Sequence, residues 1–393
     1  MPAFLTPSPL TRRTFLGAGL ALATFPRWSE ALAQVASNKE IKVALIGDTG
    51  HGDYGHGLEK PWSSFPGVRL VAVADQNPAG LAKAKARLGI PGYADYREML
   101  ATVLPDVLII GPRHIHRHHE MAMAGIQQGV RAIYMEKPFC RNLQEADEIV
   151  AACKAKNVKL ALAHRNRYHP DVERVKKHLA AGTIGTLKEL SGTGKQDRRA
   201  GAEDLWVLGS HVLNLALCFT GKATRCEATV KQDGRPLAAS DWKEGGEGIG
   251  LLAGNHIDAH FATESGVPIR FYSAAEPHRR EPVFTLRLVG TKGVIQMRFD
   301  EFPLAYLETE KGLIPLPLLP GETPGPSDAE LRKNIGDHYA CARDLLHALR
   351  THGRPLCNEE DGRDVVEMTF AIFAAQKARK PVALPLDRTL AYR

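Results

Sequence analysis

The sequence predicts an α/β protein in which a parallel sheet covered by helices is followed by an α+β region with a mainly antiparallel sheet. Short apolar, β-rich runs alternate with helical stretches from residue 41 to 163, which is the pattern of βαβ units. From residue 164 onward, β-rich runs are separated by glycine, proline and aspartate, which favours hairpins. The chain has 393 residues and is 44% apolar, so it can build two cores.

The first half is predicted to hold five parallel strands, each a short apolar run that ends at a glycine or a polar residue. The expected strands are 41–46, 68–74, 106–110, 130–135 and 158–163. The expected helices between them are 79–88, 114–128 and 143–156. The segment between the first two strands is also long enough for a crossover helix. We therefore expect one parallel-sheet domain over residues 41–163.

The second half is predicted to form a separate α+β domain over residues 164–393. Its strand-like runs are 225–231, 255–263, 269–274, 284–289 and 294–298. The expected helices are 172–181, 205–219, 337–350 and 361–379, and a surface loop is expected at 313–326. Consecutive strands joined by short polar turns favour an antiparallel sheet.

The N-terminus has the features of a removable export signal over residues 1–33, followed by a linker over 34–40. Arg12 and Arg13 precede an apolar run at 15–25, and Ala31-Leu32-Ala33 offers small residues at a cleavage site. The apolar run is too short for a stable membrane anchor, which needs about 20 residues. The segment from Thr11 to Leu16 resembles a twin-arginine signal, which implies export of a folded protein to the periplasm or beyond.

Composition argues against a nucleic-acid partner and against a metal. The net charge is +7, but the basic residues are scattered rather than gathered into a block. The six cysteines form no Cys-x-x-Cys pair, so we expect free, mostly buried thiols. Residues 113–119 contain four histidines without an acidic or cysteine partner at fixed spacing, so no metal site is expected there.

A glycine-rich turn follows the first strand, with Gly47, Thr49, Gly50 and Gly52 in succession. Glycines at this place let the backbone approach a pyrophosphate, while the N-terminus of the next helix faces the negative charge. The spacing departs from the common Gly-x-Gly-x-x-Gly, so a plain glycine loop is the alternative.

The end of the second strand favours the dinucleotide interpretation of this turn. Asp75 stands where an acidic side chain can accept hydrogen bonds from the adenosine ribose hydroxyls. Its charge would repel a 2′-phosphate, and Gln76 and Asn77 follow it instead of an arginine. The first domain is therefore predicted to be a Rossmann-type domain that binds NAD in preference to NADP.

A lysine follows the fourth strand within Met135-Glu136-Lys137-Pro138, at the same edge of the sheet. A solvent-facing Glu–Lys pair is the alternative. Together with Ile109-Ile110-Gly111-Pro112 and Asp75, this segment resembles the signature of the glucose–fructose oxidoreductase, inositol dehydrogenase and rhizopine catabolism (Gfo/Idh/MocA) family. The resemblance extends over essentially the whole chain after the signal. It implies an NAD(P)-dependent oxidoreductase, a substrate-binding second domain and a homo-oligomer.

The resemblance also implies roles for single residues. Lys137 would contact the reacting hydroxyl, while Pro112, Glu136 and Lys137 would border the cofactor and His118 would lie over it. The chemistry suits a lysine, because an ammonium beside a positively charged nicotinamide in a partly dry cleft has a lowered pKa.

The segment 204–214 is similar to the helix that carries the family's acid/base histidine, which here is His211. The aspartate that usually stands one turn before that histidine is Val207 in this chain. Asp204 lies two turns before His211 on the same helix face, so it is a candidate for meeting the substrate. A helix-capping role for Asp204 and a core role for His211 are the alternatives.

Other polar residues near the domain junction are candidates for substrate binding, although solvated surface positions are equally compatible with each. The candidates are His164, Arg167, Tyr168, Lys195 and Arg198. The expected substrate is a sugar, a polyol or a glycoside that exchanges hydride with a retained NAD. The alternatives are an exported NAD-dependent glycosidase that oxidises its sugar only transiently, and a cofactor-binding protein without catalysis.

Overall fold

The computed structural model describes residues 40–197, 199–275 and 284–387. The expected signal peptide and all but the last residue of the expected linker lie outside these residues. Residues from Glu40 onward form a single unit in their contacts. Among the described residues, no helix combines the length and the apolar character needed to cross a membrane.

The first sheet has six strands in the order β3-β2-β1-β4-β5-β6, and every pairing in it is parallel. Its strands are β1 (Ile41–Ile46), β2 (Val68–Ala74), β3 (Gly92–Tyr93), β4 (Val107–Ile110), β5 (Ala132–Met135) and β6 (Lys159–Leu162). The strand order reverses between β1 and β4, which is the place where a doubly wound sheet binds its ligand. The five predicted strands are confirmed, and β3 is an additional edge strand.

Helices follow most strands of this sheet. They are α2 (Pro78–Leu88), α3 (Tyr96–Val103), the short η2 (Ile115–Arg117), α4 (His118–Gln127) and α5 (Leu143–Lys156). Side chains of Asn77 and Asn142 cap α2 and α5 by accepting hydrogen bonds from their first amides. Of these, α3 was not expected from the sequence.

The predicted crossover helix between β1 and β2 is absent. Only η1 (Trp62–Ser64), a single 3-10 turn, interrupts the loop over residues 47–67. Five glycines fall between residues 47 and 57, and four of them have positive φ, a conformation that a right-handed helix does not contain. The glycine-rich turn consequently does not lead into a helix, and the N-terminus that lies beside it, near Thr49, is that of α2.

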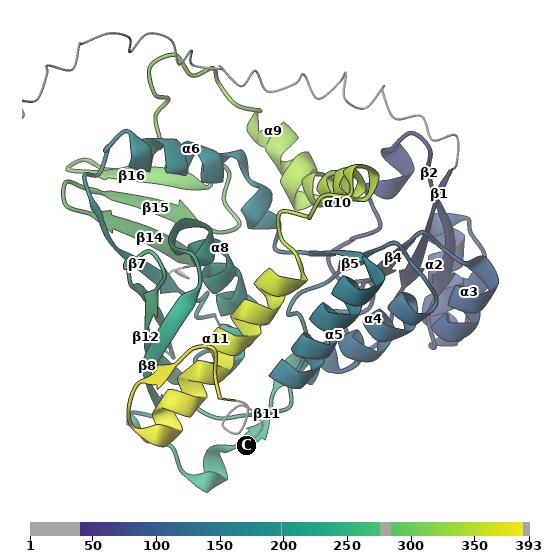
Figure 1. The fold of residues 1–393 in the computed structure, drawn as a ribbon, viewed down its shortest axis with the longest axis horizontal. Helices are drawn as coiled ribbons and strands as arrows, with labels where there is room; N and C mark the ends of the chain where they lie inside the picture. Colours follow the sequence, from purple (N-terminus) through teal and green to yellow (C-terminus); the bar gives the residue numbers. More distant parts are fainter. Residues whose placement is uncertain (1–39, 198, 276–283, 388–393) are drawn as a thin grey trace, which may run out of the picture. The chain divides into compact units, whose positions relative to one another are not determined.

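A helix from the end of the chain covers the face beside this loop. Helix α10 (Tyr339–Thr351) places Cys341 and Leu345 in one buried cluster with Leu58 and Trp62 of the loop and with apolar residues of β1. Helix α11 (Glu359–Ala378) packs against both α5 and β8, as Figure 1 shows in yellow. Helices α10 and α11, which were predicted in the second domain, therefore also pack against the first domain. This packing fixes the first sheet relative to the second sheet.

The second sheet is mainly antiparallel, as predicted, with β7 and β13 as its parallel pair. Its long path contains β17 (Gly312–Pro315), β16 (Ala305–Thr309), β15 (Val294–Arg298), β14 (Thr285–Gly290), β7 (Leu187–Thr193), β13 (Ile269–Ala274), β12 (His256–Thr263), β8 (Ala223–Gln232) and β18 (Val382–Ala383). The central β7 was not expected, because Gly192 and Ser191 weaken its strand pattern.

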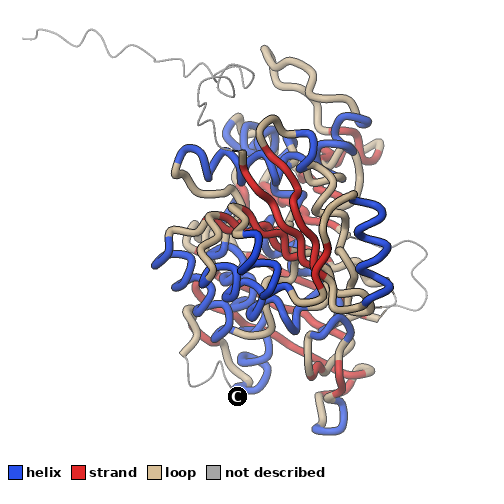
Figure 2. The backbone as a smooth tube through the Cα atoms, turned by 90° about the vertical axis from the view of Figure 1, so that its right-hand side faces the viewer, coloured by secondary structure: helices blue, strands red, loops and turns tan. Residues whose placement is uncertain are grey.

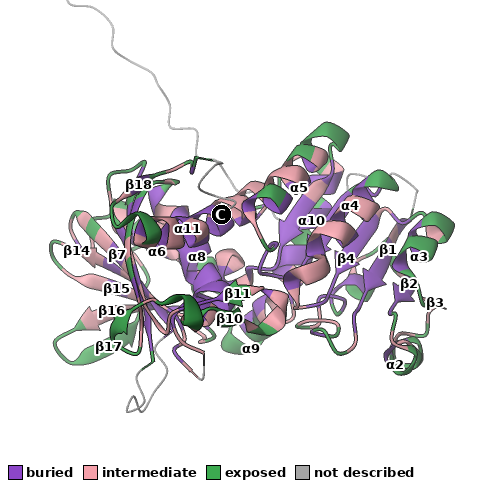
Figure 3. Ribbon diagram, turned by 90° about the horizontal axis from the view of Figure 1, so that it is seen from below, coloured by how far each residue is buried: buried purple, intermediate pink, exposed green. Residues whose placement is uncertain are grey.

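The remaining elements complete the second half. They are η3 (Arg165–Tyr168), α6 (Pro170–Ala180), α7 (Ala202–Asp204), η4 (Leu205–Gly209), α8 (Ser210–Thr220), β9 (Arg235–Pro236), η5 (Ala239–Asp241), β10 (Lys243–Glu244), η6 (Gly246–Gly248), β11 (Leu251–Leu252), α9 (Asp328–Leu331) and η7 (Arg332–Gly336). Figure 2 shows helices in blue on both sides of the red strands. The strands of the first sheet are largely buried, whereas those of the second sheet mix buried with more exposed positions, and β17 is exposed along its length (Figure 3). All six cysteines are free, and five of them are buried.

Candidate active site

The carboxyl ends of the parallel strands bring most of the predicted site residues to one edge. Gly47 follows β1, Asp75 follows β2, Pro112 follows β4 by two positions, and Lys137 follows β5 by two positions. His164 follows β6 in the same way. Because the strands are parallel and adjacent, these residues lie along the face where ligands of such sheets bind.

Asp75 is buried and holds the glycine-rich loop against the sheet. Its carboxylate accepts hydrogen bonds from the Thr49 hydroxyl at 2.6 Å and the Tyr54 hydroxyl at 2.8 Å. The backbone amides of Thr49, at 3.2 Å, and Asn77, at 2.9 Å, donate to its other oxygen. A carboxylate has about four acceptor sites, so these donors fill it. A ribose hydroxyl must displace Tyr54 or Thr49 to reach Asp75.

The loop also lies close to the strand ends around it. The ring of Tyr54 covers Gly47, where an added Cβ would lie 2.2 Å from the ring. An added Cβ at Gly52 would lie 2.4 Å from the backbone nitrogen of Arg113, after β4. Gly50, in contrast, is exposed and has open space beside its Cα. The backbone can therefore approach a ligand closely at Gly50.

The side chain of His118, which was expected over the cofactor, is enclosed between the loops after β4 and β5. Its side chain is fully buried. Its Nδ1 lies 3.0 Å from the carbonyl oxygen of Pro138, and its Nε2 lies 2.8 Å from that of Pro112. Burial lowers the pKa of His118 despite these carbonyl oxygens. The ring thus links the loops after β4 and β5, and Pro112 takes part through its carbonyl.

Glu136 anchors the far end of the glycine-rich loop. One carboxylate oxygen accepts from the His56 amide at 3.0 Å and lies 2.6 Å from the His56 ring nitrogen. Burial opposes its ionisation, but the hydrogen bond and charge of His56, together with Lys137, lower the pKa of Glu136 to about 2. Glu136 is consequently an anion that positions His56, whose side chain is 45% exposed.

Lys137 is buried between the two halves of the chain. Its ammonium donates to the backbone carbonyl of Val207 at 3.1 Å. Burial lowers the pKa of Lys137, while the negative charges of Glu136 and Glu247 oppose that shift. A buried ammonium with one carbonyl acceptor retains hydrogen-bonding capacity for another oxygen, such as a substrate hydroxyl.

His211 and His164 form a pair from opposite halves. Their Nδ1 atoms lie 3.0 Å apart, and their rings meet edge to face. Burial and the charge of Lys137 lower both pKa values, that of His164 to about 3. Both rings are therefore neutral at pH 7, so one Nδ1 carries the shared proton and the other accepts it. The Nε2 of His211 is a base if His211 donates and an acid if it accepts.

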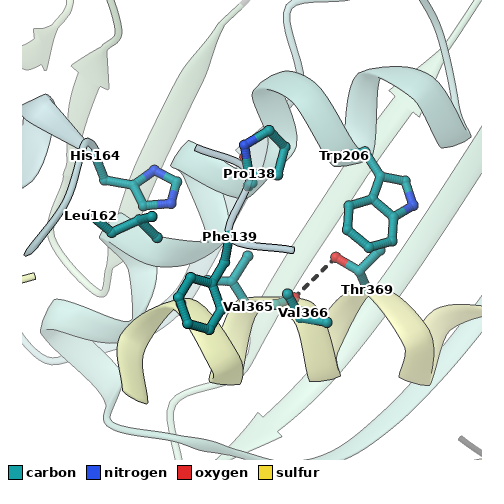
Figure 4. A pocket seen from close by; sticks show the side chains of 10 residues that line it. Pro138, Phe139, Leu162, His164, Trp206, Val365, Val366 and Thr369 are labelled. Carbon is teal, nitrogen blue, oxygen red and sulfur yellow. Dashed lines mark hydrogen bonds between the residues drawn. The ribbon is translucent and has the colours of Figure 1, made fainter. Parts of the chain in front are cut away.

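A small pocket adjoins this pair. His164 and Leu162 lie on one side, Pro138 and Phe139 above α11, and Trp206 on the far side (Figure 4). Its floor is α11, where the Thr369 hydroxyl donates to the carbonyl of Val365 at 3.0 Å. The residues after β5 and β6 therefore pack on the same helix that supports the second sheet.

Asp204 does not reach the cleft, contrary to the expectation that it contacts substrate. Its buried carboxylate accepts from the Ser273 hydroxyl at 2.6 Å and from the amides of Lys195 and Gln196 at 3.1 and 3.2 Å. Burial raises the pKa of Asp204. It holds the 194–196 loop in place, so it is a positioning residue. The capping alternative is also excluded, since Asp204 makes no side-chain cap of η4.

The segment between Asp204 and His211 contains a π-helical turn, η4, where a regular helix was expected. Such turns are frequent at functional sites. The carbonyl of Val207 within it accepts from Lys137. Val207 stands where the family usually has an aspartate. Its backbone carbonyl therefore provides the acceptor for Lys137 at this position.

Two of the candidate substrate ligands are structural. The Arg167 guanidinium donates to Asp361 at 2.9 Å and to the Asn214 carbonyl at 3.2 Å, joining α8 to α11. The Tyr168 hydroxyl lies between Asp344 and the amide of Cys357. Neither side chain is available to a substrate in this arrangement.

Lys195 remains a candidate, because it is partly exposed and its ammonium lies 3.9 Å from Asp300. Arg198 lies outside the described residues. Sequence reasoning missed Tyr54, His56 and Glu247. The first two lie in a loop interpreted as a plain phosphate-binding turn, and Glu247 lies far along the chain from Lys137.

The edge fits NAD, with one difference from the common arrangement. The strand order and the position of Asp75 are those of dinucleotide-binding sheets. The loop after β1 does not lead into a helix, but Arg113 lies after β4 at the switch point and makes no ion pair among the described residues. Arg113 and the amides around Gly50 are the groups that would face the phosphates.

Comparisons with known proteins agree with this geometry. Residues 41–164 match the sequence model of the oxidoreductase family with an NAD-binding Rossmann fold. The chain is 27% identical to levoglucosan dehydrogenase of Pseudarthrobacter phenanthrenivorans over 61% of this chain and 68% of that protein. It is 25% identical to D-apiose dehydrogenase of Paraburkholderia graminis over 90% of this chain and 92% of that protein.

The fold is also that of a solved levoglucosan dehydrogenase in complex with NADH and levoglucosan. That likeness has a TM-score of 0.66 and 20% identity, and it covers 88% of this chain and 99% of the other. The Rossmann-type fold and the resemblance expected from Asp75 and Lys137 are thereby confirmed. Residues 41–164 thus form the NAD-binding domain of the Gfo/Idh/MocA oxidoreductase family, and the chain is an NAD(P)-dependent oxidoreductase.

Proposed function

We propose that the chain is an oxidoreductase for a sugar, a polyol or a glycoside, with the reacting hydroxyl held between Lys137 and His211. The observation that carries this proposal is the buried Lys137 ammonium beside the neutral His164–His211 pair. When bound, NAD would supply the hydride acceptor or donor at this edge. The relatives whose names state a sugar, levoglucosan and D-apiose dehydrogenases, support the substrate class.

Lys137 and the histidine pair manage the hydroxyl proton. Burial lowers the pKa of Lys137, so the neutral amine is more accessible than in water and can accept the proton. The His164–His211 hydrogen bond couples the two tautomers, so a proton taken at Nε2 of His211 shifts the shared proton toward His164. Glu136 and His56 keep the glycine-rich loop over this cleft.

We further propose that the protein keeps NAD bound between turnovers and prefers NAD to NADP. The export signal expected in residues 1–33 supports retention, because free NAD is scarce outside the cytoplasm. Retention through many turnovers requires an affinity near nanomolar, about −12 kcal/mol. Mature protein is then expected to carry about one equivalent of nucleotide after gel filtration, identified after denaturation. Empty protein that needs added NAD at high micromolar levels would contradict retention.

The first prediction tests the reacting centre with Lys137→Ala. Hydride transfer to bound NAD should fall by about 10²- to 10⁴-fold, because the variant loses the group that accepts the hydroxyl proton. NAD binding should persist, because the loops at the strand ends stay intact. Single-turnover absorbance at the NADH wavelength measures the transfer, and nucleotide titration measures binding. Lys42→Ala is the matched control, since Lys42, in β1, also donates its ammonium to a backbone carbonyl, that of Val103 at the end of α3.

The outcomes separate the candidate functions. Near-normal transfer in Lys137→Ala, or equal losses in both variants, would contradict the assignment of Lys137. Release of a leaving group from a glycoside without accumulation of NADH would instead favour the transient-oxidation glycosidase, for which the missing aspartate at Val207 is the supporting feature. If no carbohydrate is turned over, the third candidate is favoured, a cofactor-binding protein without catalysis.

A further inference from the structure

A cluster of metal-ligating side chains lies at the switch point of the first sheet, outside the Lys137–His211 site. Asp48, His51 and His116 each offer one ligand atom, and these atoms lie within 4.8 Å of one another. His114 completes the cluster, with its ring centroid 5.8 Å from that of His51 and 6.2 Å from that of His116. The histidines after β4 thus meet an acidic partner from the loop after β1.

One nitrogen of the cluster lacks a partner within the protein. The Nδ1 of His116 is buried and has no hydrogen-bond partner among the described residues. A ligand at this nitrogen would complete its bonding, and imidazole is the commonest side-chain ligand of metals.

The carboxylate of the cluster is oriented by its surroundings. Asp48 is fully buried, and its Oδ1 accepts from the Gln76 side chain at 2.9 Å and lies 3.1 Å from His51 Nδ1. A proton between His51 and Asp48 thus occupies the place that a cation would take. Arg117 lies 3.4 Å from the other oxygen, but its guanidinium is also paired with Glu120 at 2.6 Å.

A turn from the second half encloses the cluster. Gly248 of η6 lies so close that an added Cβ would be 2.9 Å from His116 Nδ1. Glu247, beside it in η6, is close enough to act electrostatically on His114. The cations that face the cluster, Arg113 and Arg117, are therefore opposed by Asp48 and Glu247.

We propose that Asp48, His51 and His116 form a binding site for one divalent transition-metal ion, with His114 available as a further ligand. Two or three imidazoles with one carboxylate match the preferences of Zn²⁺, Co²⁺ and Fe²⁺ and not those of Mg²⁺ or Ca²⁺, which bind oxygen. Sequence reasoning excluded a metal at residues 113–119 because the acidic partner lies more than sixty positions earlier in the chain.

The test is a titration of metal-depleted full-length protein, prepared without a polyhistidine tag, with Co²⁺ alone. We expect one equivalent to bind at pH 7.5, with visible absorption bands from nitrogen and oxygen ligation. His116→Gln, His51→Gln and Asp48→Asn should each abolish this binding, and Gln76→Ala should weaken it by about 10-fold through loss of an outer hydrogen bond. His260→Gln is the matched control, because His260 also pairs with an aspartate, Asp258, at 3.3 Å.

The readout is independent of oxidoreductase activity, so it stands apart from the function proposed above. Circular dichroism establishes that each variant is folded, and the three ligand variants are separate, so loss of fold in one leaves two tests. Absence of Co²⁺ binding to the wild-type protein would overturn the proposal. So would binding that His116→Gln and Asp48→Asn leave unchanged, or that His260→Gln lowers equally.

Discussion

At the scale of single residues, the candidate site depends on how completely each polar group is already bonded. Asp75 has four donors and Asp204 three, so both are committed within the protein. Lys137 has one carbonyl acceptor, and His211 has one partner nitrogen. Lys137 and His211 can therefore form further hydrogen bonds, and they are the groups that can exchange a proton with a substrate.

The second prediction concerns His211. His211→Gln should lower the rate of hydride transfer by about 10²- to 10⁴-fold, because the amide cannot exchange a proton with the hydroxyl. His164→Gln should lower it less, since the glutamine carbonyl can still accept from His211 Nδ1–H and so keep its Nε2 as the base. Single-turnover rates for both variants measure the difference. Equal or absent effects would remove His211 from proton transfer.

The third prediction concerns the bonds around Asp75. Tyr54→Phe removes one of its four donors and leaves an acceptor free, so NAD affinity should rise. Asp75→Ala should lower NAD affinity, reduce the preference over NADP and destabilise the fold by about 1–3 kcal/mol, because buried donors lose their acceptor. Nucleotide titration and urea unfolding measure these effects. Unchanged NAD affinity in both variants would place the ribose elsewhere.

At the scale of elements, the loop over residues 47–67 replaces the expected helix and determines what the sheet edge can bind. Its start is held by Asp75 and its middle, at His56, by Glu136, which are carboxylates after the ends of β2 and β5. Leu58 and Trp62 anchor it in the core shared with α10. The loop is therefore a fixed part of the cleft, although it contains no regular helix.

The fourth prediction compares two glycines of this loop. Gly50 and Gly52 both have strongly positive φ, at 97° and 90°, so alanine strains the backbone at either position. Only at Gly52 does the added Cβ meet another loop, 2.4 Å from the Arg113 nitrogen. Gly52→Ala should therefore lower stability and NAD affinity more than Gly50→Ala, as measured by thermal unfolding and titration. Equal effects would show that the approach to Arg113 is not needed.

At the scale of the whole molecule, buried histidines make the fold sensitive to acid. Burial lowers the pKa of His164 to about 3 and that of His338 to about 4. The unfolded chain binds these protons near pH 6.5, while the folded protein resists them until pH 3 to 4. Stability from these groups is thus complete above pH 6.5 and decreases as the pH falls below it.

The fifth prediction follows from this difference. As the pH falls below 6.5, the two histidines together should lower the free energy of unfolding with a slope that grows to about 2.7 kcal/mol per pH unit near pH 5. Urea unfolding at pH 8, 7, 6 and 5 measures the slope. His338→Gln should halve this contribution, and His260→Gln, at an exposed position, should leave it unchanged. A slope that His338→Gln does not alter would contradict the burial argument.

The sequence by itself determined the elements with strong local patterns. The apolar runs predicted five of the six strands of the first sheet within two residues, and helix 143–156 was predicted with the bounds of α5. Asp75, Glu136 and Lys137 could be placed at one edge because parallel strands align their carboxyl ends. Element lengths and strand ends are local properties, which a pattern of residues can show.

Only the tertiary structure decided what the polar residues contact. The commitment of Asp204 to Ser273, of Arg167 to Asp361 and of His118 to two carbonyls depends on segments far apart in the chain. The same holds for the meeting of Asp48 with His116, and for the cover that α10 gives to the first sheet. A side chain's role depends on which partner satisfies it, and that partner is set by packing rather than by its neighbours in sequence.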